Sequence, residues 1–277
     1  MTDALLEGAV DLHVHGGPDV VPRRYTDLEL ATRARDAGMR AIVLKCHVES
    51  TVGRAAAAAA ATGLEVHGGL VLNAFASGGV DPETVELSLR LGARVIWMPT
   101  VAAAAHMRAF PVYSVRPARP TPVRRAALAA ICASVAAHDA MLATGHLGPR
   151  QVRELAEEAA RAGARTLVQH ADWVVPDLAP RRQAALASDF PGLVFERCAY
   201  AASPGSPRRT DVADIAGAIR ATGGAARNVI ASDLGQPENA AYPAGLAEFA
   251  RAIVSHGVSS RDVATMLAGR PAKLLGI

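Results

Sequence analysis

The chain has 277 residues, of which 51% are hydrophobic, 20% are charged and only 4% are aromatic. The length allows one large domain or two small ones, and the composition is typical of a globular protein with an aliphatic core. The small net charge of +3, with arginines spread along the chain, does not indicate nucleic-acid binding. No apolar run reaches transmembrane length, no secretory signal begins the chain, and the three cysteines are not closely spaced. We therefore expect a cytoplasmic protein that is not bound to a membrane.

The first expected strand, residues 10–15, contains two histidines in a His-x-His pattern. Side chains at i and i+2 share one face of a strand, so His13 and His15 are expected to project together, with Leu12 and Val14 on the other face. A Gly-Gly-Pro sequence follows directly and predicts that the strand ends at an open rim. Two neighbouring imidazoles suit a metal ion, although a lone His-x-His pair is also compatible with two histidines that bind no metal.

Short apolar strands alternate with helical segments along the rest of the chain. We expect strands at residues 10–15, 41–45, 65–72, 93–98, 140–144, 166–169, 193–196 and 228–232. Glycines close several of the intervening helices, and Asp81-Pro82 and Thr121-Pro122 predict helix starts.

Eight βα units predict an α/β fold of the (β/α)8 TIM barrel type, whose usual length of about 250 residues fits a single domain over residues 1–277. An open, doubly wound sheet is the alternative. Its nucleotide-binding form lacks support, because no Gly-x-Gly-x-x-Gly follows the first strand.

Polar residues stand at the ends of most of these strands, where a (β/α)8 barrel collects its catalytic groups. The strand ends hold His13, His15, Lys45, His47, Asn73, His146, His170, Glu196 and Asp233. Five of the nine histidines lie there, whereas His67, His106, His138 and His256 are expected elsewhere. The sequence therefore predicts a polar, metal-binding site at one mouth of the barrel.

This ordered set resembles the amidohydrolase superfamily of metal-dependent hydrolases, and a bacterial branch of it. The resemblance is carried by Asp11-Leu12-His13-Val14-His15, by Gly145-His146, by Gln169-His170 and by Ser232-Asp233. The tail at 269–276 is also similar to the Asn-Pro-Ala-Lys-x-Leu-Gly ending of that superfamily, with Arg270 in place of Asn. The resemblance implies metal ligands at His13, His15, His146, His170 and Asp233, and a catalytic role for Asp233.

One feature departs from that resemblance. Two-metal members use a carboxylated lysine or a glutamate, usually at the end of the fourth strand, but Val95-Ile96-Trp97-Met98-Pro99-Thr100 contains neither. Lys45 is a candidate bridge as a carboxylated lysine, and Glu49 or Glu196 are alternative oxygen ligands. A single ion is the other possibility.

Such a ligand shell predicts hydrolytic chemistry. A divalent ion lowers the pKa of a bound water to about 7 and polarises a carbonyl or phosphoryl oxygen. Zinc is the first expectation, and manganese, iron or nickel also suit these ligands. Asp233 can accept the proton of the attacking water and pass it to a leaving nitrogen or oxygen, although an aspartate in this position can also cap the next helix.

Other residues are expected to contact a small-molecule substrate, which the arginines allow to be anionic. The candidates are His47, Asn73, Glu196 and Arg116. The long segment 101–120 and the loop 200–210 are expected to shape the pocket. Their arginines can bind a carboxylate or phosphate of the substrate, or they can be surface residues without that role. Cys46 and Cys198 are expected to be core residues, on the strand faces opposite Lys45 and Glu196.

The sequence thus predicts a metal-dependent hydrolase of a C–N bond in an amide or cyclic amide. The alternatives are a metal-dependent non-oxidative decarboxylase and a catalytically silent metal-binding barrel. No nucleic-acid or membrane partner is expected, and a homo-oligomer is compatible with the sequence.

Overall fold

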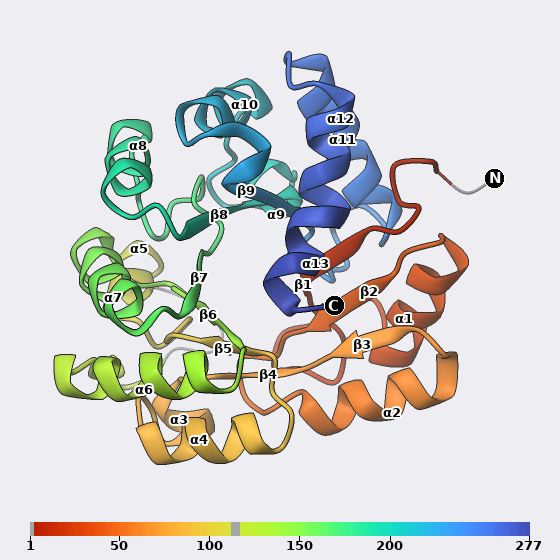
Figure 1. Ribbon diagram of the computed structural model, residues 1–277. Coiled ribbons are helices and arrows are strands. Elements are labelled where there is room, and N and C mark those ends of the chain that lie inside the picture. Colours follow the sequence, from red (N-terminus) through yellow and green to blue (C-terminus); the bar gives the residue numbers. More distant parts are fainter. Residues whose placement is uncertain (1–2, 112–116) are drawn as a thin grey trace.

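The computed structural model describes residues 3–111 and 117–277. In these residues parallel strands form a central ring with helices around it (Figure 1). The strands are β1 Val10–Val14, β2 Ala41–Leu44, β3 Glu65–His67, β4 Gly69–Val71, β5 Val95–Trp97, β6 Met141–Ala143, β7 Arg165–Val168, β8 Leu193–Cys198 and β9 Asn228–Ala231. The helices are α1 Asp27–Asp36, α2 Val52–Thr62, α3 Ala74–Ser77, α4 Pro82–Arg90, α5 Ala104–Ala109, α6 Arg125–Ala137, α7 Pro149–Ala162, α8 Pro180–Asp189, α9 Ala199–Ala202, α10 Val212–Ala221, α11 Ala244–Ser255, α12 Ser260–Ala264 and α13 Arg270–Leu275.

The strands close into a (β/α)8 barrel, which confirms the expected fold. Strands β1 to β3 pair in parallel, and so do β4 to β9. Strands β3 and β4 are two halves of the single strand expected at 65–72, separated at Gly68. On the opposite side, the backbone N–H of Asp233 donates to the carbonyl of His13 (2.7 Å), and that of His15 donates to Leu234 (2.9 Å). These bonds join the last strand to the first.

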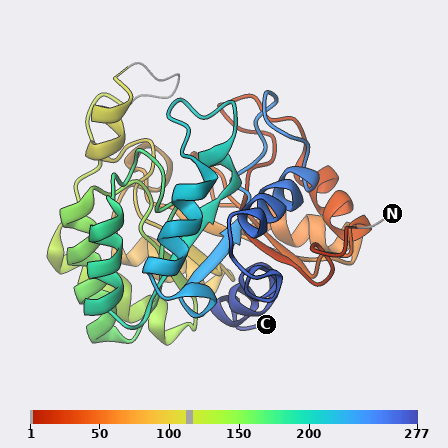
Figure 2. The same ribbon diagram turned by 90° about the horizontal axis from the view of Figure 1, so that it is seen from above.

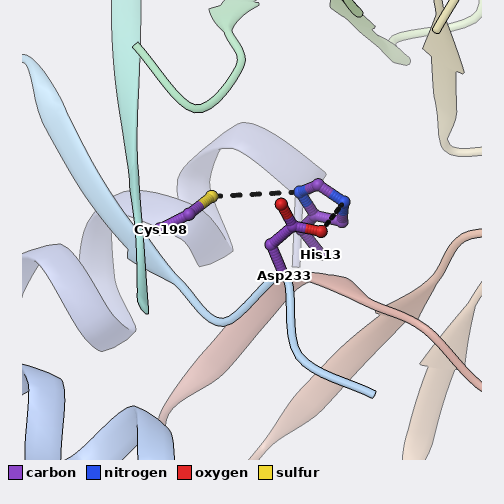
Figure 3. A group of neighbouring side chains, drawn as sticks. All are labelled: His13, Cys198 and Asp233. Carbon is purple, nitrogen blue, oxygen red and sulfur yellow. Dashed lines mark hydrogen bonds and ion pairs between the residues drawn. The ribbon is translucent and has the colours of Figure 1, made fainter. Parts of the chain in front are cut away.

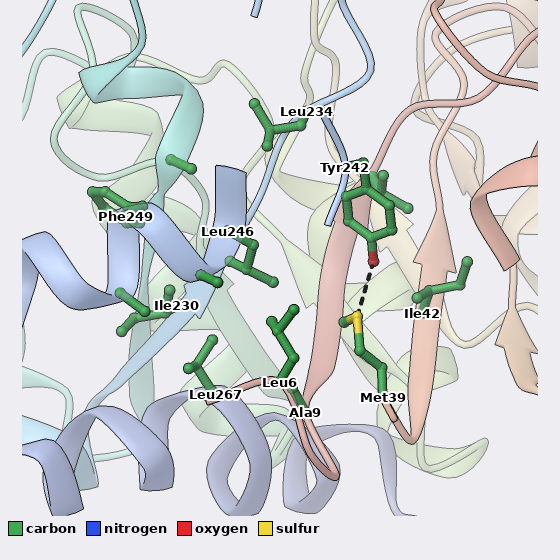
Figure 4. Packing of buried hydrophobic residues seen from close by; sticks show 14 of the residues in the cluster. Leu6, Ala9, Met39, Ile42, Ile230, Leu234, Tyr242, Leu246, Phe249 and Leu267 are labelled. Atoms are coloured by element: carbon green, nitrogen blue, oxygen red, sulfur yellow. Dashed lines mark hydrogen bonds between the residues drawn. The ribbon is translucent and has the colours of Figure 1, made fainter. Parts of the chain in front are cut away.

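Alternation along the strands divides the apolar residues between the inside and the outside of the barrel. Alternate apolar residues of the strands, for example Ala41 and Val43 of β2, point into the barrel. The C-terminal helix α13 adds apolar residues of its own to this interior. Outside, Ile42 and Leu44 of the same strand pack on the helices. Figure 4 shows part of this outer core, where the hydroxyl of Tyr242 contacts the sulfur of Met39 at 3.6 Å.

Strand β1 is irregular where the histidines begin, which corrects one expectation. Its register with β2 shifts between Asp11 and Val14. As a result Leu12 packs inside the barrel and Val14 packs outside, so the two do not share a face as a regular strand would require.

Two predicted helix starts have different outcomes. Asp81 caps α4, because its carboxylate accepts a hydrogen bond from the backbone of Thr84 (2.8 Å), and Pro82 is the first helical residue. The start expected at Thr121-Pro122 is wrong: α6 begins at Arg125, and the Thr121 hydroxyl instead accepts the backbone N–H of Ala74 (2.9 Å). In the described part of the chain no helix combines the length and apolar character needed to cross a bilayer.

Candidate metal centre

A cavity of about 350 Å³ opens at the carboxyl ends of the barrel strands. Figure 2 shows the molecule in a second view, with the loops and short helices that follow the strands at one end. The polar part of the cavity lining is His15, Arg23, Lys45, His47, His106, His146, Asp233, Gln236 and Glu238. Val21, Phe110, Trp173, Tyr200, Gly205 and Pro207 complete it.

Four of the predicted residues meet at the floor of this cavity. The Nε2 atoms of His13 and His15 lie 3.2 Å apart, and Oδ1 of Asp233 lies 3.0 Å from the first and 3.2 Å from the second. Nζ of Lys45 lies 3.1 Å from Nε2 of His13. We call His13, His15, Lys45 and Asp233 the floor cluster. It combines the ends of β1, β2 and β9.

The chain around Asp233 is shaped to bring its carboxylate to the histidines. Asp233 has a φ of +50°, which is uncommon for a residue other than glycine. Its backbone is tied to β1 by its own N–H and by the Ser232 hydroxyl, which donates to the carbonyl of His13 (2.9 Å). Gly235 follows with a φ of +140°, and a side chain there would overlap the carbonyl of His15. The local backbone therefore fixes Asp233 beside the His-x-His pair.

A second layer lies beneath the floor cluster, on the Nδ1 side of His13. Oε2 of Glu196 is 3.3 Å from that nitrogen, and Nε2 of Gln169 is 3.2 Å from it. The same Glu196 oxygen accepts the backbone N–H of His170 (3.0 Å) and the thiol of Cys198 (3.2 Å). Glu196 is fully buried and does not line the cavity, so it is not in a position to bind substrate as expected.

Cys198 corrects the sequence analysis. It was expected on the face opposite Glu196, but residues 196 and 198 share a face of β8 and both point into the barrel. Ligand atoms of His13, Cys198 and Asp233 lie within 4.8 Å of one another (Figure 3). The thiol, however, is 4.0 Å from Nδ1 of His13, whereas Asp233 contacts Nε2. The thiol therefore faces the ring nitrogen of His13 opposite the one that contacts Asp233.

Further imidazoles adjoin the floor cluster; His47, His106 and His146 line the cavity, whereas His170 does not. The rings of His13 and His170 are 6.2 Å apart, those of His170 and His146 are 4.8 Å apart, and those of His15 and His47 are 5.0 Å apart. Nδ1 of His106 lies 2.8 Å from Nδ1 of His146. His106 was expected away from the site. It comes from α5, in the long segment after β5, and its position there is the signal that could have found it.

Burial keeps most of these imidazoles neutral. Desolvation lowers the pKa of His170 and of His106 to about 4, and lowers the pKa of His15, His47 and His146 well below the ordinary value. His13 differs: burial would lower its pKa, but the charges of Asp233 and Glu196 raise it. Neutral imidazoles offer the lone pairs that a metal ion needs.

The pKa values of Lys45 and Asp233, the two charged residues of the floor cluster, are both lowered, for different reasons. Burial lowers the pKa of Lys45, although Asp233 and Glu196 oppose this shift. Burial alone would raise the pKa of Asp233, but His13 and His15 hold it well below its usual range. The carboxylate is therefore ionised at neutral pH, and the amine loses its proton more easily than an exposed lysine.

The donor atoms fit a divalent cation. Two nitrogens bound to zinc at about 2.0–2.1 Å in tetrahedral geometry are roughly 3.3 Å apart, close to the 3.2 Å between the His13 and His15 nitrogens. Nδ1 of His170 is buried and has no hydrogen-bond partner among the residues that the structure describes. A buried ring nitrogen left without a partner is costly unless it binds an ion or water. His13, His15, Asp233 and His170 thus provide a fitting ligand set.

Not every predicted residue joins this site. Nδ2 of Asn73 donates to the carbonyl of His47 (3.0 Å) and to the Thr100 hydroxyl, and its Oδ1 accepts the backbone N–H of Thr100 (2.9 Å). Asn73 therefore braces two loops and does not line the cavity. Glu49 is half-exposed, pairs with Arg54 (2.5 Å) and does not line the cavity. Arg116 lies outside the described residues.

Arg23 lines the cavity, a role that strand ends did not indicate. Its side chain is almost fully buried and binds Asp19 through Nε (2.8 Å) and Nη2 (2.6 Å). Nη2 also lies 3.2 Å from Nδ1 of His15. Arg208 and Arg209 of the 200–210 loop are exposed and do not line the cavity.

Comparison with known proteins places the chain in a family. Residues 8–196, more than half of the chain, match the model of a family of unknown function, DUF6282. The protein belongs to this family. No curated protein matches the DUF6282 chain.

Solved structures similar to the DUF6282 chain support the barrel. A mutant of an organophosphorus hydrolase from Deinococcus radiodurans has 17% identity and a TM-score of 0.64, with 97% of this chain and 93% of that chain covered. A zinc-bound amidohydrolase from Burkholderia multivorans has 16% identity and a TM-score of 0.54, covering 97% and 99%. Enamidase, described as a member of the amidohydrolase superfamily, has 14% identity and a TM-score of 0.59, covering 98% and 68%. At these identities the likeness concerns the fold.

Proposed function

We propose that this protein is a metal-dependent hydrolase of small molecules that cleaves a C–N bond in an amide or cyclic amide. The observation that carries the proposal is the meeting of two Nε2 atoms and one carboxylate oxygen, within 3.2 Å of one another, at the floor of a cavity. Similarity to the structures of an amidohydrolase, an organophosphorus hydrolase and enamidase supports the same class of reaction.

His13, His15 and Asp233 would hold the cation, with His170 or His146 completing the shell. Zinc is the proposed ion, because the ligands are nitrogen and oxygen atoms and one structural neighbour binds zinc. When bound, a divalent cation supplies Lewis acidity, which polarises a carbonyl group and favours deprotonation of water.

Asp233 is proposed to move the proton. Its carboxylate is ionised, because His13 and His15 hold its pKa well below the usual range, so Oδ1 or Oδ2 can accept a proton from the attacking water. The same carboxyl group then donates this proton to the departing nitrogen. Glu196 keeps His13 oriented through its contact with Nδ1, which leaves Nε2 of the same ring directed at His15 and Asp233.

Lys45 is proposed to supply the oxygen ligand that the fourth strand lacks. Its amine is buried beside His13 and its pKa is lowered, both of which favour reaction of the neutral amine with carbon dioxide. The products are a carbamate and one proton. A carbamate at Lys45 would allow two ions, and an unmodified Lys45 would accompany one.

Elemental analysis and a hydrolysis screen test the proposal. Protein purified without chelator is expected to hold one or two divalent ions per chain and to release carboxylate and amine or ammonia from an amide panel. Asp233→Asn should abolish turnover while circular dichroism is unchanged, and His256→Asn, at an exposed position, is the matched control. Release of carbon dioxide from substrate carboxylates, or no metal under metal-replete conditions, would contradict it.

A further inference from the structure

Three aromatic side chains form one wall of the cavity. The rings of Phe110 and Trp173 are stacked, 5.2 Å apart with an angle of 22° between their planes, and Tyr200 meets Trp173 edge-on at 5.7 Å. All three line the cavity. They come from three separate segments, which follow β5, β7 and β8. We call Phe110, Trp173 and Tyr200 the aromatic wall.

The aromatic wall is unusual for this chain. The whole protein has only 2 Trp, 4 Tyr and 5 Phe, and its core is filled mainly by aliphatic side chains. The wall lies in a small apolar cluster that is distinct from the barrel interior and from the two outer cores. Trp173 is fixed there, since its indole N–H donates to the Ser206 hydroxyl (3.0 Å). Aliphatic residues would suffice to close the loops, so aromatic rings that line a cavity indicate a ligand that contacts them.

The aromatic wall adjoins the imidazoles of His146 and His170. The Trp173 ring is 5.3 Å from His170 and 5.9 Å from His146. Arg23 contacts His15 instead, at the other side of the floor cluster. A short substituent on a ring stacked against the wall would lie beside His146 and His170, and the ring of His170 is 6.2 Å from that of His13 in the floor cluster.

We propose that the cavity binds a small compound with one flat aromatic ring and a short polar arm. The ring stacks against Phe110, Trp173 and Tyr200, and the arm reaches the floor cluster. A volume of about 350 Å³ is at the lower end of the usual range for ligand pockets, which suits a compound of this size. The identity of the arm as a hydrolysable group rests on the proposed function. The binding of the ring rests on the aromatic wall alone.

Three alcohols with the same hydroxymethyl group test the ring. Benzyl alcohol carries a flat ring, cyclohexylmethanol carries a saturated ring, and ethanol carries none. Binding to the purified full chain is measured by calorimetry and by ligand-observed NMR. We expect benzyl alcohol to bind at least about tenfold more tightly than ethanol and about threefold more tightly than cyclohexylmethanol.

Variants assign the binding to the wall. Phe110→Ala should weaken the binding of benzyl alcohol by about tenfold. The control is Phe75→Ala, at an exposed phenylalanine on α3 that does not line the cavity, and it should leave the affinity unchanged. Trp173→Leu is the second test, and near-ultraviolet circular dichroism verifies that each variant is folded. Equal affinities for benzyl alcohol and ethanol, or equal effects of Phe110→Ala and Phe75→Ala, would overturn the inference.

The experiment separates this inference from the proposed function. None of the three alcohols contains a bond that the enzyme would hydrolyse, so their binding does not depend on catalysis. Ring binding in a protein without metal-dependent turnover would overturn the proposed function and leave the wall's role intact. Turnover of aliphatic and aromatic amides with equal kcat/KM would overturn the wall's role and leave the hydrolase.

Discussion

Nζ of Lys45 lies 3.1 Å from Nε2 of His13, and both side chains are buried at the end of neighbouring strands. An unpaired buried ammonium is costly, so this amine needs either a carboxylate partner or a change of chemistry. Its pKa is lowered by burial, which makes the neutral amine more accessible than at the protein surface. Under the proposed metal-dependent function, Lys45 is therefore the residue that decides between one bound ion and two.

We expect Lys45 to carry a carbamate in the metal-loaded protein. The chain contains only one other lysine, Lys273, which is exposed. In protein loaded with zinc in ¹³C-bicarbonate, a carbamate resonance should be seen by NMR in the natural protein and in Lys273→Met but not in Lys45→Met. Lys45→Met should also bind one ion fewer. Absence of the resonance in all three proteins would favour the single-ion form.

Loss of a proposed histidine ligand should release the metal. His13→Ala and His170→Ala are each expected to lower metal affinity by more than about 100-fold, beyond the cost of removing a group that only orients a ligand. His256→Ala, at an exposed site, should keep the natural ratio of metal to chain. Elemental analysis after dialysis measures the ratio. Full metal content in both His13→Ala and His170→Ala would show that the ligand set is different.

Cys198 should be dispensable for metal binding. Its thiol faces Nδ1 of His13 and Glu196, and burial raises its pKa well above the ordinary value, so it remains a neutral thiol. Cys198→Ala is expected to retain the metal and to lose about 1–2 kcal/mol of unfolding free energy, measured by urea denaturation. Loss of metal in this variant would instead indicate an ion among His13, Cys198 and Asp233.

Gly145 should tolerate no side chain. Its φ is +55°, and a methyl group there would overlap the backbone carbonyl of Met98. Gly145→Ala is expected to cost about 2–4 kcal/mol and to displace His146, which follows it. Gly163→Ala is the control, because Gly163 also has a positive φ but has open space around it, so only about 1 kcal/mol is expected. Similar losses in both variants would mean that the overlap is relieved by small shifts.

His106 should make the metal-free protein sensitive to acid. Burial lowers its pKa to about 4 from an ordinary 6.5, so the stability linked to it is present above pH 6.5 and is lost as the pH falls towards 4. At pH 5 this loss amounts to about 2 kcal/mol. Urea denaturation at pH 7.5 and pH 5 should therefore show a smaller acid loss in His106→Asn than in the natural protein. An equal loss in both would contradict the burial of a neutral His106.

Most of the barrel follows from apolar runs and their spacing. Each expected strand overlaps a strand of the structure, because a parallel barrel strand is apolar on both faces and stands out from amphipathic helices. The break at Gly68 and the irregularity of β1 were not predicted, since both depend on neighbouring strands. Thr121 carried a helix-start pattern but bonds to Ala74, a tertiary contact that local sequence does not contain.

The site was predicted in outline but not in depth. The rule that strand ends meet at one mouth brought together His13, His15, Lys45 and Asp233. The same rule does not distinguish a residue that lines the cavity from one beneath it, which is why Asn73 and Glu196 were assigned to substrate. Residues supplied by loops, such as His106, Arg23 and the aromatic wall, follow no strand spacing. Their positions depend on how the loops fold over the mouth.

The bonds from Asp233 to His13 and from His15 to Leu234 have a consequence for the nascent protein. His13 leaves the ribosome early, but its carboxylate partner follows 220 residues later, counting from 13 to 233. Until β9 has been made, one edge of β1 has no partner strand, and His13 and His15 lack the carboxylate of Asp233. Under the proposed metal-dependent function, the ion is therefore bound only after β9 has been made, and a chain truncated before β9 is expected to depend on chaperones.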